Sequence, residues 1–157
     1  MTQAVARFRN LVLTQGSADA FVQASEATGI DPGNGKGWLL TRVETWFPIA
    51  SNLQGMSADA AVHFALTRDS KAALSDLSDS DVIFCDGFSN ALTTSGEVVV
   101  PNLYVNVLPE GTVIVEPTIY AHLDSTATGL TMTAHMRIYY EEVRLSEIEI
   151  LRMLSQG

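Results

Sequence analysis

The sequence has little charge and few lysines. Charged residues make up 17% of its 157 residues, against about a quarter in a typical soluble domain. Lys36 and Lys71 are the only lysines, and the net charge is −9. A protein that binds duplex nucleic acid unaided normally carries the opposite sign. We therefore expect any nucleic-acid contact of this chain to be weak or indirect, and we interpret Arg7 and Arg9 as exposed charges on a first strand.

The sequence also lacks disulfide and targeting signals. Cys85 is the single cysteine, so no disulfide can form within the chain. After Val82-Ile83-Phe84 it is more typical of a small buried hydrophobic residue than of a catalytic thiol. The first residues lack the apolar segment of a signal peptide, and no apolar run approaches the roughly 18 residues that span a membrane. These absences predict synthesis in the cytoplasm and no membrane span.

Most of the chain consists of runs in which apolar and polar residues alternate, as they do along half-buried β-strands. In the clearest run, one predicted face carries Leu130, Met132, Ala134, Met136, Ile138 and Tyr140. The opposite face carries Thr131, Thr133, His135, Arg137 and Tyr139. Turn-forming clusters separate the runs. We predict strands over residues 4–13, 18–28, 38–47, 60–67, 81–90, 98–108, 112–124 and 130–145.

Two of these segments carry further expectations, and a third is ambiguous. Unbroken alternation over residues 38–47 predicts one face with Trp38, Leu40, Arg42, Glu44 and Trp46. It predicts the other face with Leu39, Thr41, Val43, Thr45 and Phe47. The pair Asp86-Gly87 suggests a β-bulge within its strand. Residues 18–28 also fit a helical period, so a helix remains an alternative there.

The end of the chain changes period. Ser146 and Glu149 have the spacing of a capping box, and Ile148, Leu151 and Leu154 follow at helical spacing. We expect a short C-terminal helix or turn. With no βαβ alternation and no linker, the pattern predicts one domain over residues 1–157, an all-β antiparallel sandwich or barrel of about eight strands.

No candidate for phosphate or metal binding has complete spacing. The cluster Gly33-Asn34-Gly35-Lys36-Gly37 lacks the Ser or Thr of a phosphate-binding loop, so we interpret it as a β-turn. Asp76, Asp79, Asp81 and Asp86 form an acidic group. They are typical of a solvated loop, and a weak structural cation bound there remains an alternative. We predict no cofactor, no metal site and no catalytic residue.

The remaining candidates are histidines, carboxylates and aromatic residues. His63, His122 and His135 each fall on the polar side of a predicted strand, which indicates surface or interface positions that can respond to pH. Glu141 and Glu142 read as a polar strand end rather than a catalytic pair. Four aromatic residues could form a carbohydrate platform, although core or interface anchors are more typical at strand spacing. They are Trp38, Trp46, Tyr104 and Tyr120.

In strand number and order, size and neutral polar surface, the chain resembles the single jelly-roll coat proteins of viruses. The resemblance covers nearly the whole chain and rests on architecture, without a diagnostic motif. It implies an eight-stranded jelly roll that self-assembles into a shell through trimer- or hexamer-like capsomers. Many such proteins carry a basic N-terminal arm, which is absent here. The resemblance therefore implies that another protein, such as a second coat protein, or an internal membrane faces the genome.

Three functions remain open at this point. A virion structural protein is favoured by the all-β pattern and the many Thr, Ser and Ala residues, which cost little to bury against neighbours. A carbohydrate-binding sandwich would need an exposed row of aromatic side chains. An enzyme of the cupin type would need clustered His and Glu ligands, and no His-x-His spacing occurs. Other phage or tail assembly roles are also compatible with the pattern.

Overall fold

A computed structural model of the chain describes residues 7–48, 60–73, 78–89, 102–126 and 128–154. The described part contains nine strands, one 3₁₀ turn and one α-helix. In chain order these are β1 (Arg7–Thr14), β2 (Val22–Ala27), η1 (Pro32–Asn34), β3 (Lys36–Trp46), β4 (Ala61–Thr67), β5 (Val82–Ser89), β6 (Leu103–Val107), β7 (Val113–Ile114), β8 (Thr118–Thr126), β9 (Thr133–Arg144) and α1 (Glu147–Leu154).

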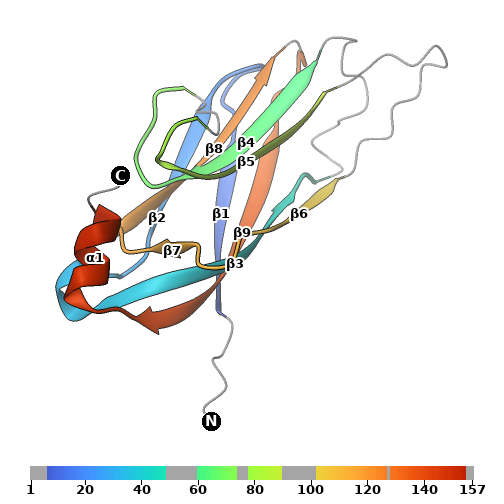
Figure 1. The fold of residues 1–157 in the computed structure, drawn as a ribbon. Coiled ribbons are helices and arrows are strands. Elements are labelled where there is room, and N and C mark those ends of the chain that lie inside the picture. The colour runs from blue at the N-terminus through green and yellow to red at the C-terminus, as the bar shows by residue number, and fades with distance from the viewer. Residues whose placement is uncertain (1–6, 49–59, 74–77, 90–101, 127, 155–157) are drawn as a thin grey trace.

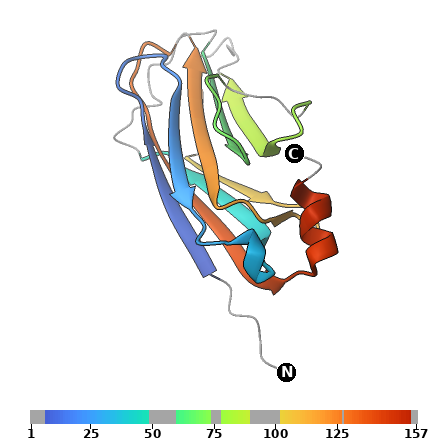
Figure 2. The same cartoon turned by 90° about the vertical axis from the view of Figure 1, so that its left-hand side faces the viewer.

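The strands form two antiparallel sheets that face each other as a sandwich (Figures 1 and 2). One sheet has the order β1-β9-β3-β6, with β7 also paired to β3, and the other has the order β2-β8-β4-β5. The first strand therefore lies beside the last, and the chain crosses repeatedly between the sheets, as in a jelly roll. The predicted all-β antiparallel sandwich with a short C-terminal helix is confirmed.

The predicted strand segments differ from the structure mainly at residues 112–124. That segment contains two strands, β7 in one sheet and the start of β8 in the other. Pro117 lies between them, and a proline has no N–H to donate to a sheet ladder. The ambiguous segment 18–28 contains β2, so its helical alternative is wrong.

β3 does not alternate as the sequence predicts. The register shifts between Leu40 and Arg42 where β3 pairs with β9, which marks a β-bulge at Thr41. One extra residue reverses the side-chain alternation beyond it. Leu40 and Val43 are therefore both buried, whereas Glu44 and Trp46 point outward. The bulge lets both apolar halves of β3 face the core.

The predicted bulge at Asp86-Gly87 is wrong, because the shift between β4 and β5 lies at Leu66/Thr67, opposite Ile83. Gly87 has a different role. A Cβ atom at that position would lie 2.6 Å from the carbonyl oxygen of Val62 and 2.9 Å from Nδ1 of His63. The glycine thus permits the close approach of β5 to β4.

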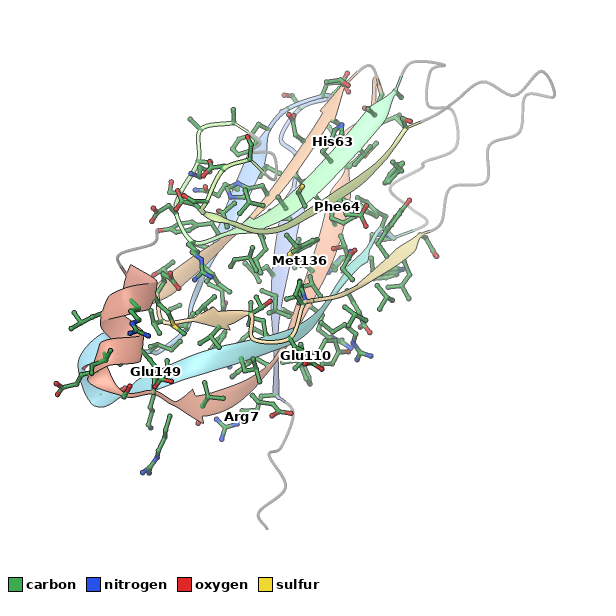
Figure 3. All side chains as sticks on the ribbon, viewed as in Figure 1. Arg7, His63, Phe64, Glu110, Met136 and Glu149 are labelled. Atoms are coloured by element: carbon green, nitrogen blue, oxygen red, sulfur yellow. The ribbon has the colours of Figure 1, made fainter. Side chains whose placement is uncertain are left out.

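The core lies between the sheets and contains apolar residues from both. Phe64 of β4 and Met136 of β9 both lie in this interior (Figure 3). Trp38 and Tyr140 stack with ring centroids 3.7 Å apart. The apolar face predicted for residues 130–140 is confirmed, since Met132, Ala134, Met136, Ile138 and Tyr140 are all buried.

The C-terminal capping box is confirmed. Glu149 accepts hydrogen bonds from the backbone N–H and the hydroxyl of Ser146, both at 2.7 Å. These bonds hold the pKa of Glu149 below its usual value. The helix buries Ile150, while Ile148 and Leu151 stay exposed. No helix in the described residues is long and apolar enough to cross a membrane.

Candidate assembly surface

The sheet β1-β9-β3-β6 turns a regular array of side chains away from the core. Cross-strand pairing aligns these residues in three rows of four, which we call the outer face. The first row is Val12, His135, Trp46 and Leu103. The second row is Asn10, Arg137, Glu44 and Val105. The third row is Phe8, Tyr139, Arg42 and Val107.

The outer face is apolar along its two edge strands. Six of the eight large apolar side chains that are exposed in the described residues belong to it: Phe8, Val12, Trp46, Leu103, Val105 and Val107. Val107 has the highest exposed fraction, 78%. Monomeric proteins rarely leave so many large apolar groups together on one face, and such patches mark interaction sites.

β6 is inverted relative to an ordinary half-buried strand. Its apolar residues, Leu103, Val105 and Val107, point outward, while Tyr104 and Asn106 lie on the side of the core. Burial raises the pKa of Tyr104 to about 12, and its ring packs on Phe88 at 5.3 Å. An edge strand with outward apolar residues invites contact with another chain, so this arrangement points to an occupied outer face.

The middle of the outer face is polar, and its charges are already held in place. The Arg42 guanidinium lies 4.0 Å from the centre of the Tyr139 ring. The Tyr139 hydroxyl donates a 2.9 Å hydrogen bond to Glu44, and Arg137 donates one of 3.0 Å to Asn10. Because these side chains are positioned in advance, covering them would cost little additional ordering.

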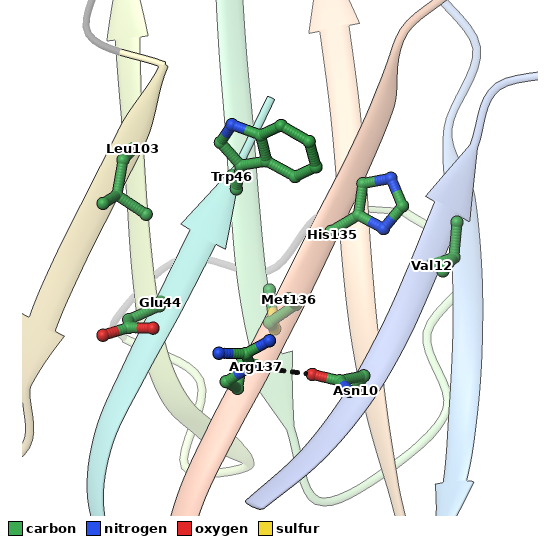
Figure 4. A pocket seen from close by; sticks show the side chains of 8 residues that line it. All are labelled: Asn10, Val12, Glu44, Trp46, Leu103, His135, Met136 and Arg137. Carbon is green, nitrogen blue, oxygen red and sulfur yellow. Dashed lines mark hydrogen bonds between the residues drawn. The ribbon is translucent and has the colours of Figure 1, made fainter. Parts of the chain in front are cut away.

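A shallow groove of about 570 Å³ runs across the first two rows (Figure 4). Trp46 and His135 border it, with ring centroids 5.2 Å apart, and the buried Met136 also lines it. The groove combines an aromatic wall with Glu44 and Arg137. It can therefore accept an aromatic or apolar group that carries a polar partner.

Part of the outer face of the second sheet, around His122, is covered by the chain itself. Thr67 donates to the carbonyl of Asp69 at 2.6 Å, and the backbone N–H of Lys71 donates to Gln23 of β2 at 2.8 Å. The segment after β4 therefore crosses β8 and reaches β2. His122 of β8 is completely buried beneath it, so the prediction of a surface or interface position for His122 is wrong.

The hydrogen bonds of Thr67 identify the tautomer of His122. The single hydroxyl proton of Thr67 goes to Asp69, so its oxygen must accept from Nε2–H of His122, at 2.7 Å. Nδ1 then carries no proton and has no partner in the described residues. Burial, with a further contribution from Lys71, lowers the pKa of His122 to about 4. The imidazole is therefore neutral near pH 7.

Two carboxylates of the acidic group, Asp79 and Asp81, form ion pairs with Lys71. Lys71 Nζ lies 2.9 Å from Asp79 and 2.7 Å from Asp81, and these bonds raise the pKa of Lys71. Asp86 lies apart on β5, and Asp76 falls outside the described residues. Nowhere in the described ranges do three or more metal-ligating side chains come together. The ammonium of Lys71 thus lies beside Asp79 and Asp81, where a bound cation was the alternative expected from the sequence.

The structure separates the other candidate pairs. Glu141 and Glu142 are neighbours on β9 and so point to opposite faces, and Glu142 pairs with Arg7. Arg9 pairs with Glu26, so Arg7 and Arg9 are exposed charges on the first strand, as predicted. The glycine-rich cluster is a turn, as predicted, in which Asp31 caps η1 and Gly35 is left-handed.

The aromatic candidates do not share one surface. Trp38 is buried in the core and Trp46 is 43% exposed on the outer face. Tyr104 packs with core aromatic residues. His63 is exposed, while His135 is half-buried beside Trp46. Cys85 is half-buried opposite Ala65 on the outer side of β5, so it is less buried than predicted.

Comparisons with known proteins establish the fold. No family model and no curated protein sequence matches the chain. VP1 of chimpanzee polyomavirus is similar in structure, with a TM-score of 0.59 and 8% identity over 93% of this chain and 97% of that one. VP1 of trichodysplasia spinulosa-associated polyomavirus gives 0.53 and 9% over 88% and 96%. The fold is that of the viral jelly-roll capsid proteins.

The sequence alone does not predict that the residues of the outer face form one surface. Its residues come from four strands that are distant in the sequence, and their adjacency depends on the sheet order. One signal was present: the alternation Leu103, Val105, Val107 against Tyr104 and Asn106 is apolar on one side. Without the sheet, that side reads as the one that faces the core.

Proposed function

We propose that this protein is a virion structural protein, a capsid or shell subunit that assembles with copies of itself through its sheet faces and loops. The inverted strand β6 carries the proposal, because it presents Leu103, Val105 and Val107 to the exterior. A jelly-roll fold like that of viral capsid proteins supports it. The described residues also contain no cluster of three or more metal-ligating side chains.

The proposal includes the organisation of the particle. Residues 1–157 form one jelly-roll domain that builds trimer- or hexamer-like capsomers in the virion, after synthesis in the host cytoplasm. A second coat protein can complete the shell. Contact with nucleic acid is weak or indirect, as the net charge of −9 favours.

Carbohydrate binding is the second candidate, and the groove favours it. Trp46 borders the groove, and Asn10, Glu44 and Arg137 supply hydrogen-bonding groups there. Aromatic faces beside polar side chains are suited to sugar rings. Against it, Trp38 lies in the core, so the expected row of exposed aromatic residues is incomplete. A glycan array separates the two candidates.

The main test is light scattering after size exclusion, followed by negative-stain microscopy, over a range of protein concentrations. We expect oligomers and closed particles. Val107→Lys should abolish them without loss of folding, because the side chain is already exposed. Ile148→Lys on α1 is the matched control, because Ile148 is also highly exposed but does not belong to the outer face. A chain that stays monomeric throughout would refute the proposal.

A further inference from the structure

The outer face is chemically self-complementary. Its rows divide into a β1/β9 half and a β3/β6 half, and in five of the six corresponding pairs the two residues suit each other chemically. On the inner strands, Arg137 corresponds to Glu44, Tyr139 to Arg42 and His135 to Trp46. On the edge strands, the counterparts are Phe8 and Val107, Val12 and Leu103, and Asn10 and Val105.

We infer that the outer face binds the same face of a second copy of this chain around a two-fold axis that runs parallel to the strands, midway between β9 and β3. This inference rests on the proposed function, since it names the partner surface within the assembly. Rotation about this axis places β9 opposite β3 of the second copy and β1 opposite β6. Every contact then occurs twice, as in any isologous interface.

Five of the six kinds of contact made by this rotation match in charge or polarity, and Asn10 against Val105 is the exception. Arg137 meets Glu44 of the second copy, and Arg42 meets the ring of Tyr139. The edge strands bring apolar groups together, with Phe8 against Val107. Two sheets can pack this way with their strands nearly aligned, about 10 Å apart. The face thus buries its apolar edges and pairs its central charges in one step.

The alternative two-fold axis, perpendicular to the strands and through the second row, gives the opposite result. It would place Arg137 against Arg137 and Glu44 against Glu44. Juxtaposed like charges cost several kcal/mol at an interface. Charge therefore favours the axis parallel to the strands over this perpendicular axis.

Two of the inferred pairs repeat contacts that the chain already makes within itself. Arg42 lies 4.0 Å from the Tyr139 ring centre, and Trp46 lies 5.2 Å from His135. In the dimer, Trp46 of the second copy would face His135, which lines the groove. The open space on the surface is then filled by an aromatic ring.

Charge reversal with mixing tests the interface. Glu44→Arg places arginine opposite Arg137, and Arg137→Glu places glutamate opposite Glu44. Each variant alone should raise the dissociation constant of the dimer roughly 100-fold or more. An equimolar mixture of the two should form heterodimers of near-normal affinity, measured by analytical ultracentrifugation. Thermal unfolding of each variant checks that it still folds.

Cysteine cross-linking tests the axis. In a Cys85→Ala background, Phe8→Cys with Val107→Cys should give disulfide-linked dimers under mild oxidation. Phe8→Cys with Val12→Cys should give none, although it would under the perpendicular axis. Neither cysteine pair can form a disulfide within one chain. Positions 8 and 107 lie three strands apart in the sheet, and positions 8 and 12 lie four residues apart along β1.

The outcomes separate this inference from the proposed function. If both charge-reversal variants still form the particles that the wild type forms, the inference is overturned and the capsid role stands. A wild-type dimer with no larger particle, disrupted by each variant and restored by the mixture, would uphold the inference and count against the capsid role. Failure of the mixture to associate, or cross-links from the second cysteine pair, would also overturn the inference.

Discussion

His122 shows how a single residue can depart from its sequence pattern. It alternates with core residues along β8 and so points away from the core, yet it is fully buried. The segment after β4 covers it, and Thr67 accepts its Nε2–H. The local sequence does not predict this covering segment. Its position depends on the hydrogen bond between Lys71 and Gln23, which are far apart in the chain. Burial of this residue makes folding sensitive to acid.

The pH dependence follows from the sign of the shift. The pKa of His122 is about 4 in the folded protein and about 6.5 in an unfolded chain. The unfolded state therefore binds more protons between these values, and stability falls as the pH drops below about 6.5. We expect a loss of about 2 kcal/mol in the free energy of unfolding between pH 7.5 and pH 5, measured by chemical denaturation.

The control for this effect is the exposed His63. His63→Gln should keep the wild-type pH profile, whereas His122→Gln should flatten it over the same range. Equal slopes for the wild type and His122→Gln would show that another group is responsible. The pKa values of Asp19 and Glu149 are lowered, so their contributions are lost only at more acidic pH.

Gly87 gives a second prediction at this scale. Gly87→Ala would force a Cβ atom to within 2.6 Å of the Val62 carbonyl oxygen, so we expect a loss of about 2 kcal/mol or more in stability. Gly16→Ala is the matched control, because no atom lies within 4 Å of the added Cβ. Thermal unfolding compares the two. Equal melting temperatures would contradict the close approach of β5 to β4.

At the level of elements, the sequence predicts strands well and faces less well. Period-two alternation located the strands because burial of one face dictates it. It could not reveal the extra residue at Thr41, which reverses the face of β3 midway. Nor could it orient β6, whose apolar side faces outward. Both features are resolved only by pairing with distant strands, and both determine the composition of the outer face.

The capping box of α1 is the element that sequence predicts most directly, because both partners lie within one turn. Ser146→Ala removes the hydroxyl that bonds Glu149. We expect a local cost of about 1 kcal/mol, seen as faster hydrogen exchange of the α1 amides. Glu147→Gln, which alters charge in the same turn but not the capping pair, is the control. Unchanged exchange in Ser146→Ala would contradict a role for the cap.

At the scale of the whole molecule, most basic side chains in the described residues are already paired with acidic ones. The chain has nine lysine and arginine residues against 18 acidic ones. Five of the cations already pair with carboxylates in the described residues: Arg7, Arg9, Arg42, Arg68 and Lys71. Cations that are already neutralised release few counterions from a phosphate backbone.

We therefore expect no stable complex with duplex DNA or RNA at physiological salt, measured by fluorescence anisotropy. The same titration at low salt is the control, because any nonspecific Coulomb attraction would appear there first. A tight complex that weakens steeply with added salt would contradict the prediction.

The cover over His122 has a consequence for how far association can proceed. A sandwich whose two sheets both exposed apolar outer faces could stack without end, as strands do in fibrils. Here the segment after β4 lies across part of the β2-β8-β4-β5 sheet, and none of the large apolar side chains exposed in the described residues belongs to that sheet. If the outer faces pair as inferred, face-to-face stacking would stop at two molecules, and growth beyond a pair would have to use other surfaces.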